Sequence, residues 1–542
     1  MTPYLQHLNI QTANSGFYKG INRWVAIPSK LIIGILILWA VIFPTHANYF
    51  LTNFNGFILS NFAAWYIWTM ALFMLLCLAL ILWPAGGRLK LGQSGDEPEF
   101  STFSWISMMF GAGIGVGMMT WSVAEPLYHL QNSPEVILGT ADAKQKNNAV
   151  NAFKWAYLHW GISAWTCYAI TGLAMGYFAY RKNLPLTIRS SLVALFGSKL
   201  EGSLGHIIDI VAVVATILGV TQTLGFGVEQ FVAGMHRIGL GEWLLNDAGK
   251  PTFSATIFTV LIIVGTSTLS AISGVGKGIK WLSNLNMGLS VFLLLFFLIF
   301  GATWFALSMF GVGIAEYLRD LPKMSFKVWP SDGSETGDAL AAWQGVWTVF
   351  TFAWWIAFAP FVGLFLARIS KGRSIREFIL GAVIAPSIIC ITWFAFAGGT
   401  AAHLELSGLA KGTIFAASDG AKMFVTVDVI LASAGAVISW LMAVIIVTLL
   451  MTYLVTSVDS AILIVNTINS GGSNTFEPYR HIIFWGIILG LVVTVLLLIG
   501  GLNAIKTAMV IGALPFSLVM VLMCISLTKA IYKDTRPKSV SA

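Results

Sequence analysis

The chain has 542 residues, of which 57% are hydrophobic and only 10% are charged, and its mean hydropathy is +0.81. Soluble proteins carry about 25% charged residues, so this composition excludes an ordinary water-soluble protein and indicates one that is covered by lipid. The net charge of +8 fits basic loops on one side of a membrane, and we expect no nucleic-acid partner. The 4 cysteines lie singly in apolar runs, which argues against a disulfide framework or a metal site.

Apolar runs of membrane length recur along the whole chain and predict an all-α polytopic membrane protein with about 12 transmembrane helices. These runs lie near residues 28–46, 61–84, 103–124, 151–180, 203–233, 253–273, 281–310, 343–366, 377–398, 429–455, 481–500 and 506–528. An even number places both termini on one side, and the basic clusters, above all RISKGRSIRE and the C-terminal tail, favour the cytoplasm for that side. We therefore expect a cytoplasmic N-terminal segment at 1–27, one membrane domain at 28–528 and a short cytoplasmic tail at 529–542.

The third span contains the glycine-rich run GAGIGVG, from Gly111 to Gly117. Such a run weakens a helix and lets a ligand approach the backbone, with amides for a carboxylate and carbonyls for a cation. The alternative is close packing between helices through small residues. The alternation of the glycines and the WSVAEPLYHL that follows them favour the ligand-binding interpretation.

Two other spans carry aromatic clusters, and each cluster faces one way on a continuous helix. They are Trp160, Trp165 and Tyr168 on the fourth span and Trp354, Trp355 and Phe358 on the eighth. Aromatic residues usually anchor helices at the membrane interface, but both clusters lie well inside their spans. Two such faces that meet form a cage that attracts a trimethylammonium group by cation–π interaction, without a formal negative charge. Sulfonium compounds and other bulky cations fit the same cage.

The tenth span ends in YLVTSVDSA, in which Thr456 and Ser457 supply adjacent hydroxyls one turn after Tyr453. Sodium is a hard cation that prefers oxygen ligands, so hydroxyls and the freed carbonyls of a broken helix suit it. Hydroxyls in membrane helices also commonly bond their own backbone, and the residues alone leave both interpretations open.

Few ionisable side chains lie at membrane depth, and the acidic ones near span ends are Glu125, Asp209, Glu229 and Asp459. Such groups are functional candidates, but pairing or helix capping explains them equally well. The mid-span Gln222 needs a partner, and His159 stands beside the fourth-span rings. The roles of Gln222, Asp209 and His159 stay open. No nucleophile, metal or acid–base set stands at one depth, so we do not expect an enzyme.

Three segments resemble the betaine/choline/carnitine transporter family: MMFGAGIGVGMMTWSVAEPLYHL, HWGISAWTCYAITGLAMGYFAYR and AWWIAFAPFVGLFLARISKGR. The resemblance covers essentially the whole chain. It implies a core of two inverted five-helix repeats, similar to that of sodium/amino-acid symporters, at 103–310 and 343–528, with the first two spans peripheral. It also implies a homotrimer in a bacterial inner membrane and alternating access around a site at the membrane midplane.

The resemblance also implies the site residues. The family's aromatic positions and glycines are matched by Trp160, Trp165, Tyr168, Trp354, Trp355, Phe358, Gly113, Gly115 and Gly117. Family members often have tryptophan at the position of Phe358, whose smaller ring offers a weaker cation–π surface. A sodium site between the third and tenth spans is implied at Gly111, Ile114, Tyr453, Thr456 and Ser457. Choline carriers of the family tend to have aspartate at the position of Gly117, so glycine there favours a zwitterion.

We therefore expect a secondary active transporter that imports a quaternary-ammonium zwitterion, such as glycine betaine or a similar compatible solute, with sodium as the coupling ion and no other cofactor. Two alternatives stay open: a sodium-independent exchanger of carnitine and betaine, and a proton-coupled carrier of choline or of a sulfonium solute resembling dimethylsulfoniopropionate. An ion channel is disfavoured because no span is continuously polar. The short C-terminal tail argues against strong osmotic regulation.

Overall fold

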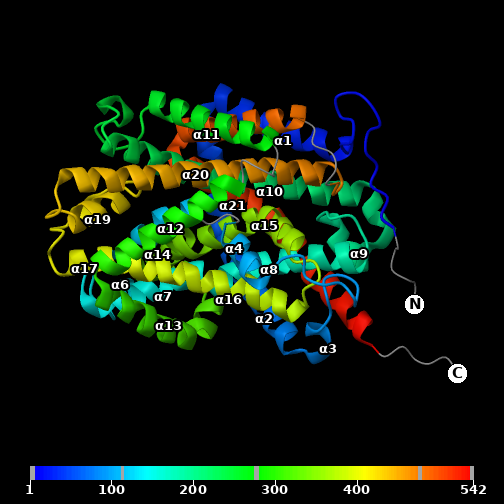
Figure 1. Cartoon of the computed structure of the whole chain (residues 1–542), viewed down its shortest axis with the longest axis horizontal. Helices are drawn as coiled ribbons and strands as arrows, with labels where there is room; N and C mark the ends of the chain where they lie inside the picture. The colour runs from blue at the N-terminus through cyan, green and yellow to red at the C-terminus, as the bar shows by residue number, and fades with distance from the viewer. Residues whose placement is uncertain (1–6, 112–114, 274–279, 474–478, 537–542) are drawn as a thin grey trace.

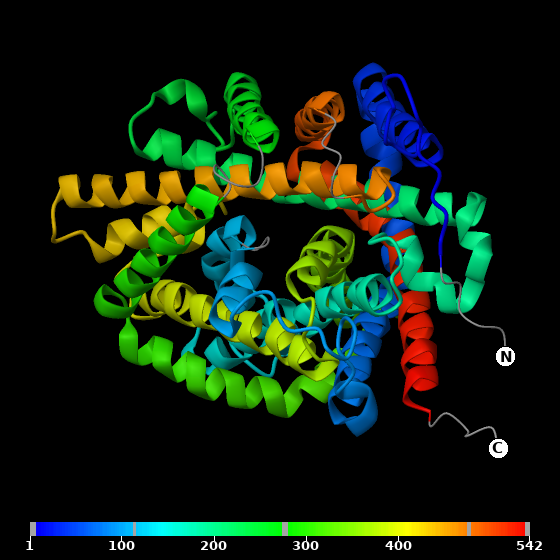
Figure 2. The same cartoon turned by 45° about the vertical axis from the view of Figure 1, so that its right-hand side comes forward.

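The computed structural model describes residues 7–111, 115–273, 280–473 and 479–536. These residues form helices throughout, and the only β-type pairing among them is at three isolated bridges. Long helices lie side by side across the molecule, with α10 (Ser203–Arg237) against α20 (Ala436–Asn469), as Figure 1 and Figure 2 show. The all-α class expected from the apolar runs is confirmed.

The helices follow one another along the chain with short connections. The first half contains α1 (Arg23–Ile42), α2 (Pro44–Leu82), α3 (Pro84–Gly87), α4 (Thr102–Gly111), α5 (Gly115–Gln131), α6 (Pro134–Ile137), α7 (Ala149–Trp160), α8 (Ile162–Gly176), α9 (Val193–Phe196), α10 and α11 (Phe253–Ser273). The second half contains α12 (Lys280–Phe300), α13 (Thr303–Phe326), α14 (Glu335–Gln344), α15 (Phe350–Ile369), α16 (Ile375–Trp393), α17 (Gly399–Leu406), α18 (Thr413–Ala416), α19 (Lys422–Ile430), α20 and α21 (Tyr479–Thr535). Two π-helical turns, η7 (Gly345–Val349) and η8 (Phe394–Gly398), join α14 to α15 and α16 to α17.

Within the described ranges, nine helices are long and apolar enough to cross a membrane, so the chain is a multi-pass membrane protein. One of them, α21, contains non-helical backbone at Gly500 and Gly501, where the expected eleventh span ends. The expected fourth span is divided at Gly161 between α7 and α8, and the described parts of the expected third span are α4 and α5, so neither span is among the nine. The number of twelve spans and the repeat architecture stay predictions.

Several helix boundaries differ from the expected spans. The tenth span was expected to end near residue 455, but α20 continues to Asn469. The second span was expected to begin near residue 61, but α2 begins at Pro44, a residue suited to the first turn of a helix. The seventh was expected to reach residue 310, but α12 ends at Phe300 and α13 follows as a separate helix. A Cβ on Gly301 would lie only 2.3 Å from the Thr400 Oγ1, so the chain turns there under close packing.

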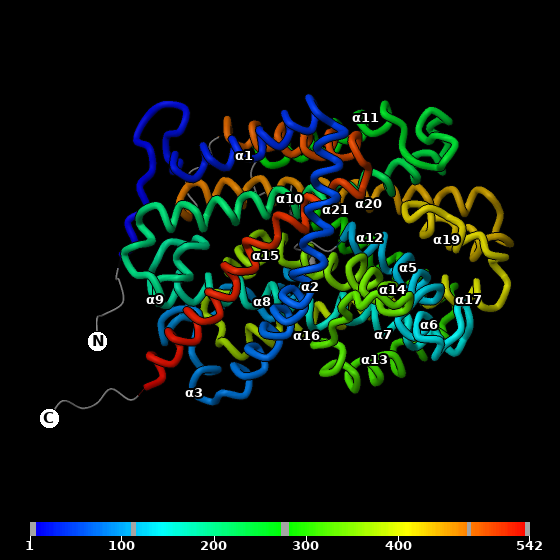
Figure 3. The backbone as a smooth tube through the Cα atoms, turned by 180° about the vertical axis from the view of Figure 1, so that it is seen from behind, coloured from blue at the N-terminus to red at the C-terminus, as the bar shows by residue number. Residues whose placement is uncertain are grey.

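The eighth expected span forms the centre of the molecule. Its α15 is apolar all round and almost entirely buried, as expected for such a helix, and it packs against α8, α10 and α21. By contrast, α1 exposes large apolar side chains such as Leu31 and Ile35, which suits a lipid-facing helix. The short α9 and the C-terminal end of α21 lie at one end of the molecule, and α6, α17 and α19 lie at the other (Figure 1, Figure 3).

Candidate functional site

Rings from α7, α8 and α15 meet inside the molecule. The Trp355 ring centroid lies 5.6 Å from that of Trp160, 5.8 Å from that of Trp165 and 4.9 Å from that of Tyr168. All four side chains are buried, and the distances are typical of paired aromatic rings. We call these four residues the aromatic box. The residues predicted from two separate spans are therefore neighbours in the structure.

The helix break at Gly161 directs these rings toward one another. The continuous helix expected over 151–180 is wrong, because Gly161 ends α7 and precedes α8 with a φ of −94° and a ψ of −137°. A Cβ on this residue would lie 2.6 Å from the Tyr157 carbonyl oxygen, so the close approach requires glycine. The rings therefore do not meet because they share one face of a continuous helix, as was expected. Trp160 enters the box from the end of one helix, and the α8 rings enter it from the next.

A small cavity of about 20 Å³ adjoins the aromatic box. It is lined by Gly117, Trp160, Tyr168, Thr223, Trp354, Trp355 and Phe358. A Cβ on Gly117 would lie 3.0 Å from ring atoms of both Trp160 and Trp354, so these two rings close over the α5 backbone. The cavity is about the size of one water molecule. A quaternary-ammonium head therefore requires the rings to move apart.

The predicted sodium-site residues on α20 contact both α5 and α12. A Cβ on Gly115 would lie 2.0 Å from the Tyr453 ring, so α5 and α20 touch closely at this point. Thr456 Oγ1 donates to its own helix, 3.0 Å from the Thr452 carbonyl oxygen, as the structural alternative predicts. Ser457 is buried beside it. Gly111 ends α4, whereas Gly113 and Ile114 lie outside the described residues.

Two polar residues of α12 join this region and were not singled out in the sequence. The Asn286 amide donates to Thr456 Oγ1 at 3.1 Å, and the Ser290 and Tyr453 hydroxyls lie 2.5 Å apart. The side-chain oxygen Oδ1 of Asn286 is buried and has no hydrogen-bond partner among the described residues. The spacing of four residues puts both side chains on one helix face, which is the signal that the sequence offered.

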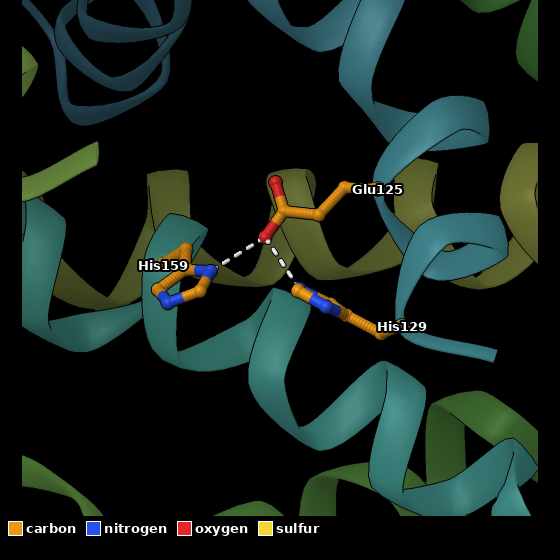
Figure 4. A group of neighbouring side chains, drawn as sticks. All are labelled: Glu125, His129 and His159. Atoms are coloured by element: carbon orange, nitrogen blue, oxygen red, sulfur yellow. Dashed lines mark hydrogen bonds and ion pairs between the residues drawn. The ribbon is translucent and has the colours of Figure 1, made fainter. Parts of the chain in front are cut away.

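A buried carboxylate connects the aromatic box to two histidines. Glu125 Oε1 lies 2.6 Å from His159 Nδ1 and 3.3 Å from His129 Nε2 (Figure 4). Glu125 Oε2 accepts a hydrogen bond of 2.7 Å from the Trp160 indole. His159 Nε2 in turn lies 3.0 Å from Thr348 Oγ1 on η7. Glu125 and both histidines are at most 1% exposed. We call Glu125, His129 and His159 the carboxylate–histidine cluster.

The cluster explains residues whose roles the sequence left open. His159 is not a lone histidine, because it bridges α5 and η7 through Glu125 and Thr348. Glu125 and His129 stand four residues apart on α5, on one helix face. The three ligand atoms lie within 4.8 Å of one another, a donor set that zinc accepts. Both Glu125 oxygens are already hydrogen-bonded, however, so the arrangement suits a group that positions Trp160.

A larger cavity of about 200 Å³ lies on the other side of the Trp160 and Trp354 rings. Its lining residues are Trp121, Glu125, Tyr128, Trp160, Val346, Trp347, Phe350, Thr351, Trp354, Asp419 and Lys506. Trp160 and Trp354 line both this large cavity and the small one. The two cavities differ in character, because charged side chains line the large cavity and none lines the small one. The two rings therefore separate a charged chamber from an aromatic one.

The other polar residues noted in the sequence are distributed away from the box. Asp209 is fully buried and accepts a 2.6 Å hydrogen bond from Arg189, which makes it a structural ion pair. Asp459 accepts from the Ser270 hydroxyl at 2.7 Å. Gln222 is buried, and neither of its amide atoms has a hydrogen-bond partner among the described residues. Its neighbour on α10, Thr223, lines the small cavity, whereas Gln222 is not among the described lining residues.

Comparison with known proteins fits this architecture. The family model of the betaine/carnitine/choline transporters matches residues 24–536. The chain belongs to this transporter family. It is 35% identical over 516 residues to the glycine betaine transporter OpuD of Bacillus subtilis, covering 95% of this chain and 94% of that protein. It is also 36% identical over 528 residues to an osmo-dependent choline transporter of Acinetobacter baylyi, covering 96% of this chain and 73% of that protein.

The relatives include proteins with different named substrates. A protein of Haemophilus influenzae described as an uncharacterized transporter is 38% identical over 518 residues, covering 94% of this chain and 73% of its own length. Similar identities to a betaine transporter and to a choline transporter do not separate the two substrates. The family and its named relatives are transporters, so this member is a membrane transporter and not an enzyme.

Proposed function

We propose that the chain is a secondary active transporter that imports a quaternary-ammonium zwitterion, such as glycine betaine, together with sodium. The observation that carries this proposal is the aromatic box, in which three rings surround Trp355 at 4.9–5.8 Å. Methylated onium groups are held by cation–π attraction and apolar contact, and tryptophan offers the strongest ring surface. None of the described residues that line the small cavity is acidic, so the site suits a solute that brings its own negative charge.

The carboxylate of such a solute needs hydrogen-bond donors near the box. The Trp355 indole N–H is buried and has no partner among the described residues. We infer that this donor binds the carboxylate while the methylated head lies against the rings.

The coupling ion is assigned to the contact between α4, α5 and α20. The hydroxyls of Thr456 and Ser457 and the backbone oxygens of Gly111, Ile114 and Tyr453 are the proposed sodium ligands. The close contact of Gly115 with Tyr453 means that a ligand at this point holds α5 and α20 together. Alternating access then follows from sodium and substrate stabilising the same pair of helices. We further propose a homotrimer in a bacterial inner membrane with both termini in the cytoplasm.

Uptake into proteoliposomes tests the proposal directly. Radiolabelled glycine betaine, carnitine, choline and dimethylsulfoniopropionate are compared under an inward sodium gradient, an inward proton gradient, and no gradient with unlabelled substrate inside. We expect glycine betaine uptake that depends on the sodium gradient and saturates with substrate. Uptake that needs internal substrate and no sodium would instead identify an exchanger, and choline uptake under a proton gradient would identify a choline carrier.

A further inference from the structure

The function proposed so far gives no role to Lys506, a lysine that lines the large cavity. Lys506 lies on α21, six residues after the non-helical Gly500, and its side chain lines the large cavity. Its ammonium nitrogen lies 5.7 Å from the ring centroid of Trp121, 5.4 Å from that of Phe226 and 5.0 Å from that of Phe350. The ammonium therefore rests against an aromatic wall within a membrane-spanning helix.

Among the described residues, Lys506 makes no hydrogen bond or ion pair with an oxygen acceptor. The nearby Lys422 differs, because it donates to the Phe415 and Ala417 carbonyl oxygens and lies 3.8 Å from Asp419. An ammonium carries three N–H donors and no acceptor, and leaving them unpaired at membrane depth is costly. The ring contacts attract the charge but supply no oxygen acceptor to these donors.

The acidic groups that line the same cavity are already engaged. Glu125 holds the two histidines and Trp160 through both of its oxygens. Asp419 accepts a 2.8 Å hydrogen bond from the Tyr128 hydroxyl and lies beside Lys422. Asp419 and Glu229, the latter on α10, are both near enough to interact electrostatically with Lys506, but neither forms an ion pair with it within the described ranges. Lys506 is thus the charged group of the cavity wall that still lacks an acceptor.

We propose that Lys506 binds the carboxylate of the transported zwitterion in the large cavity, while the methylated head lies against Trp160 and Trp354. This inference rests on the proposed function, and it makes the large cavity a first binding site that precedes the aromatic box. A lysine ammonium is a compact charge that pairs well with a carboxylate. Because Trp160 and Trp354 line both cavities, the head passes from one site to the other along the same rings.

The position of Lys506 also makes it a specificity-determining residue. A net cation such as choline has no carboxylate to offer, and its charge is repelled by the ammonium in the same 200 Å³ cavity. The carboxylate of a betaine is attracted by the Lys506 ammonium, and its methylated head lies against the Trp160 and Trp354 rings. Lys506 therefore favours zwitterions over simple cations before either solute reaches the box.

The test compares the binding of two ligands, glycine betaine and choline, to each of three Lys506 variants. Lys506→Met and Lys506→Gln remove the charge and keep most of the side-chain volume, and Lys506→Arg keeps the charge. The Kd values for glycine betaine and choline are measured by calorimetry on the purified full-length protein, together with the KM of betaine uptake. We expect the neutral variants to weaken betaine binding by roughly ten- to hundredfold, the range for hydrogen bonds to charged groups. Choline binding should be unchanged or tighter, and Lys506→Arg should keep the wild-type preference.

Equal weakening of both ligands, or no change in either, in the neutral variants would overturn the proposal, because general damage to the site has no preference between them. If the neutral variants do not fold, a shift of Lys506→Arg toward choline overturns it and an unchanged preference supports it. Lys422→Gln is the matched control, since it removes a nearby lysine that does not line the cavity. It should leave the betaine-to-choline ratio unchanged. A wild-type protein that binds neither ligand would refute the proposed function itself. A failure of the proposed function is therefore distinguishable from a failure of the inference about Lys506.

Discussion

Replacing Glu125 by alanine tests whether the buried carboxylate holds the Trp160 ring in its binding orientation. In the structure, one oxygen accepts from the Trp160 indole at 2.7 Å, and the other lies 2.6 Å from His159. Alanine removes both contacts and leaves the indole N–H and the His129 and His159 rings without their acceptor. We therefore expect two separable effects, a loss of stability from the cluster and a loss of substrate affinity through Trp160.

The magnitudes follow from the burial of the cluster. Glu125 is 1% exposed and both histidines are 0% exposed, so removing one partner leaves uncompensated buried polar groups, which costs about 3–5 kcal/mol. A hydrogen bond to a charged group contributes about 1.5–3 kcal/mol net. That second range sets the largest loss of affinity that can pass through the Trp160 contact, and it corresponds to a Kd raised roughly ten- to hundredfold.

A double-mutant cycle separates the two effects. Trp160→Phe keeps a ring in the box but removes the indole N–H, so it abolishes the hydrogen bond to Glu125 without touching the histidines. Calorimetric Kd values for glycine betaine in the wild type, both single variants and the double variant give the coupling free energy. We expect Glu125→Ala to weaken binding in the wild type and to have little further effect in the Trp160→Phe background. Additive losses would refute the reasoning, because Glu125 would then act on substrate by another route.

Three further substitutions probe the remaining parts of the site. Trp355→Ala should raise the Kd for glycine betaine by at least roughly a hundredfold, since its ring contacts each of the other three; near wild-type affinity by calorimetry would exclude the box as the binding site. Replacing Thr456 and Ser457 together by alanine should raise the sodium concentration for half-maximal uptake, and an unchanged sodium dependence would point to protons or exchange. Gly115→Ala should destabilise the protein by about 1–3 kcal/mol through overpacking, because the new Cβ meets the Tyr453 ring at 2.0 Å. Thermal unfolding measures this loss, and an unshifted midpoint would mean that α5 and α20 are free to separate.

The helical class was accessible from the sequence because it depends on local composition, whereas the box residues were identified by their resemblance to positions of the transporter family. An apolar α15 with two adjacent tryptophans must be buried wherever it packs. The break at Gly161 was not accessible, since a single glycine inside an apolar run is also common in unbroken membrane helices. The non-helical ψ of −137° at Gly161 shows that this glycine ends α7.

The charged residues of the site were harder to predict, because their partners come from distant parts of the chain. The third span was expected to end near residue 124, which put Glu125 at a span end. In the structure α5 continues to Gln131, so Glu125 and His129 lie on one buried helix face. Lys506 stood at the start of an expected span, where snorkelling to the interface is the ordinary outcome. Its place in a cavity wall depends on α5, α10 and η7 packing around it, and no sequence spacing encodes that.

The two cavities together give a physical reason for preferring a zwitterion. The small cavity has aromatic rings, Gly117 and Thr223 in its wall but no charged side chain, so a net cation that enters it leaves its counter-charge behind. Moving an unpaired charge from a polar chamber into an apolar one is costly even where rings attract it. A betaine carries its carboxylate with it and remains neutral overall during the same step. The chamber that contains Lys506 already favours the zwitterion over a net cation, and the step into the box adds to that preference because the zwitterion is its own ion pair.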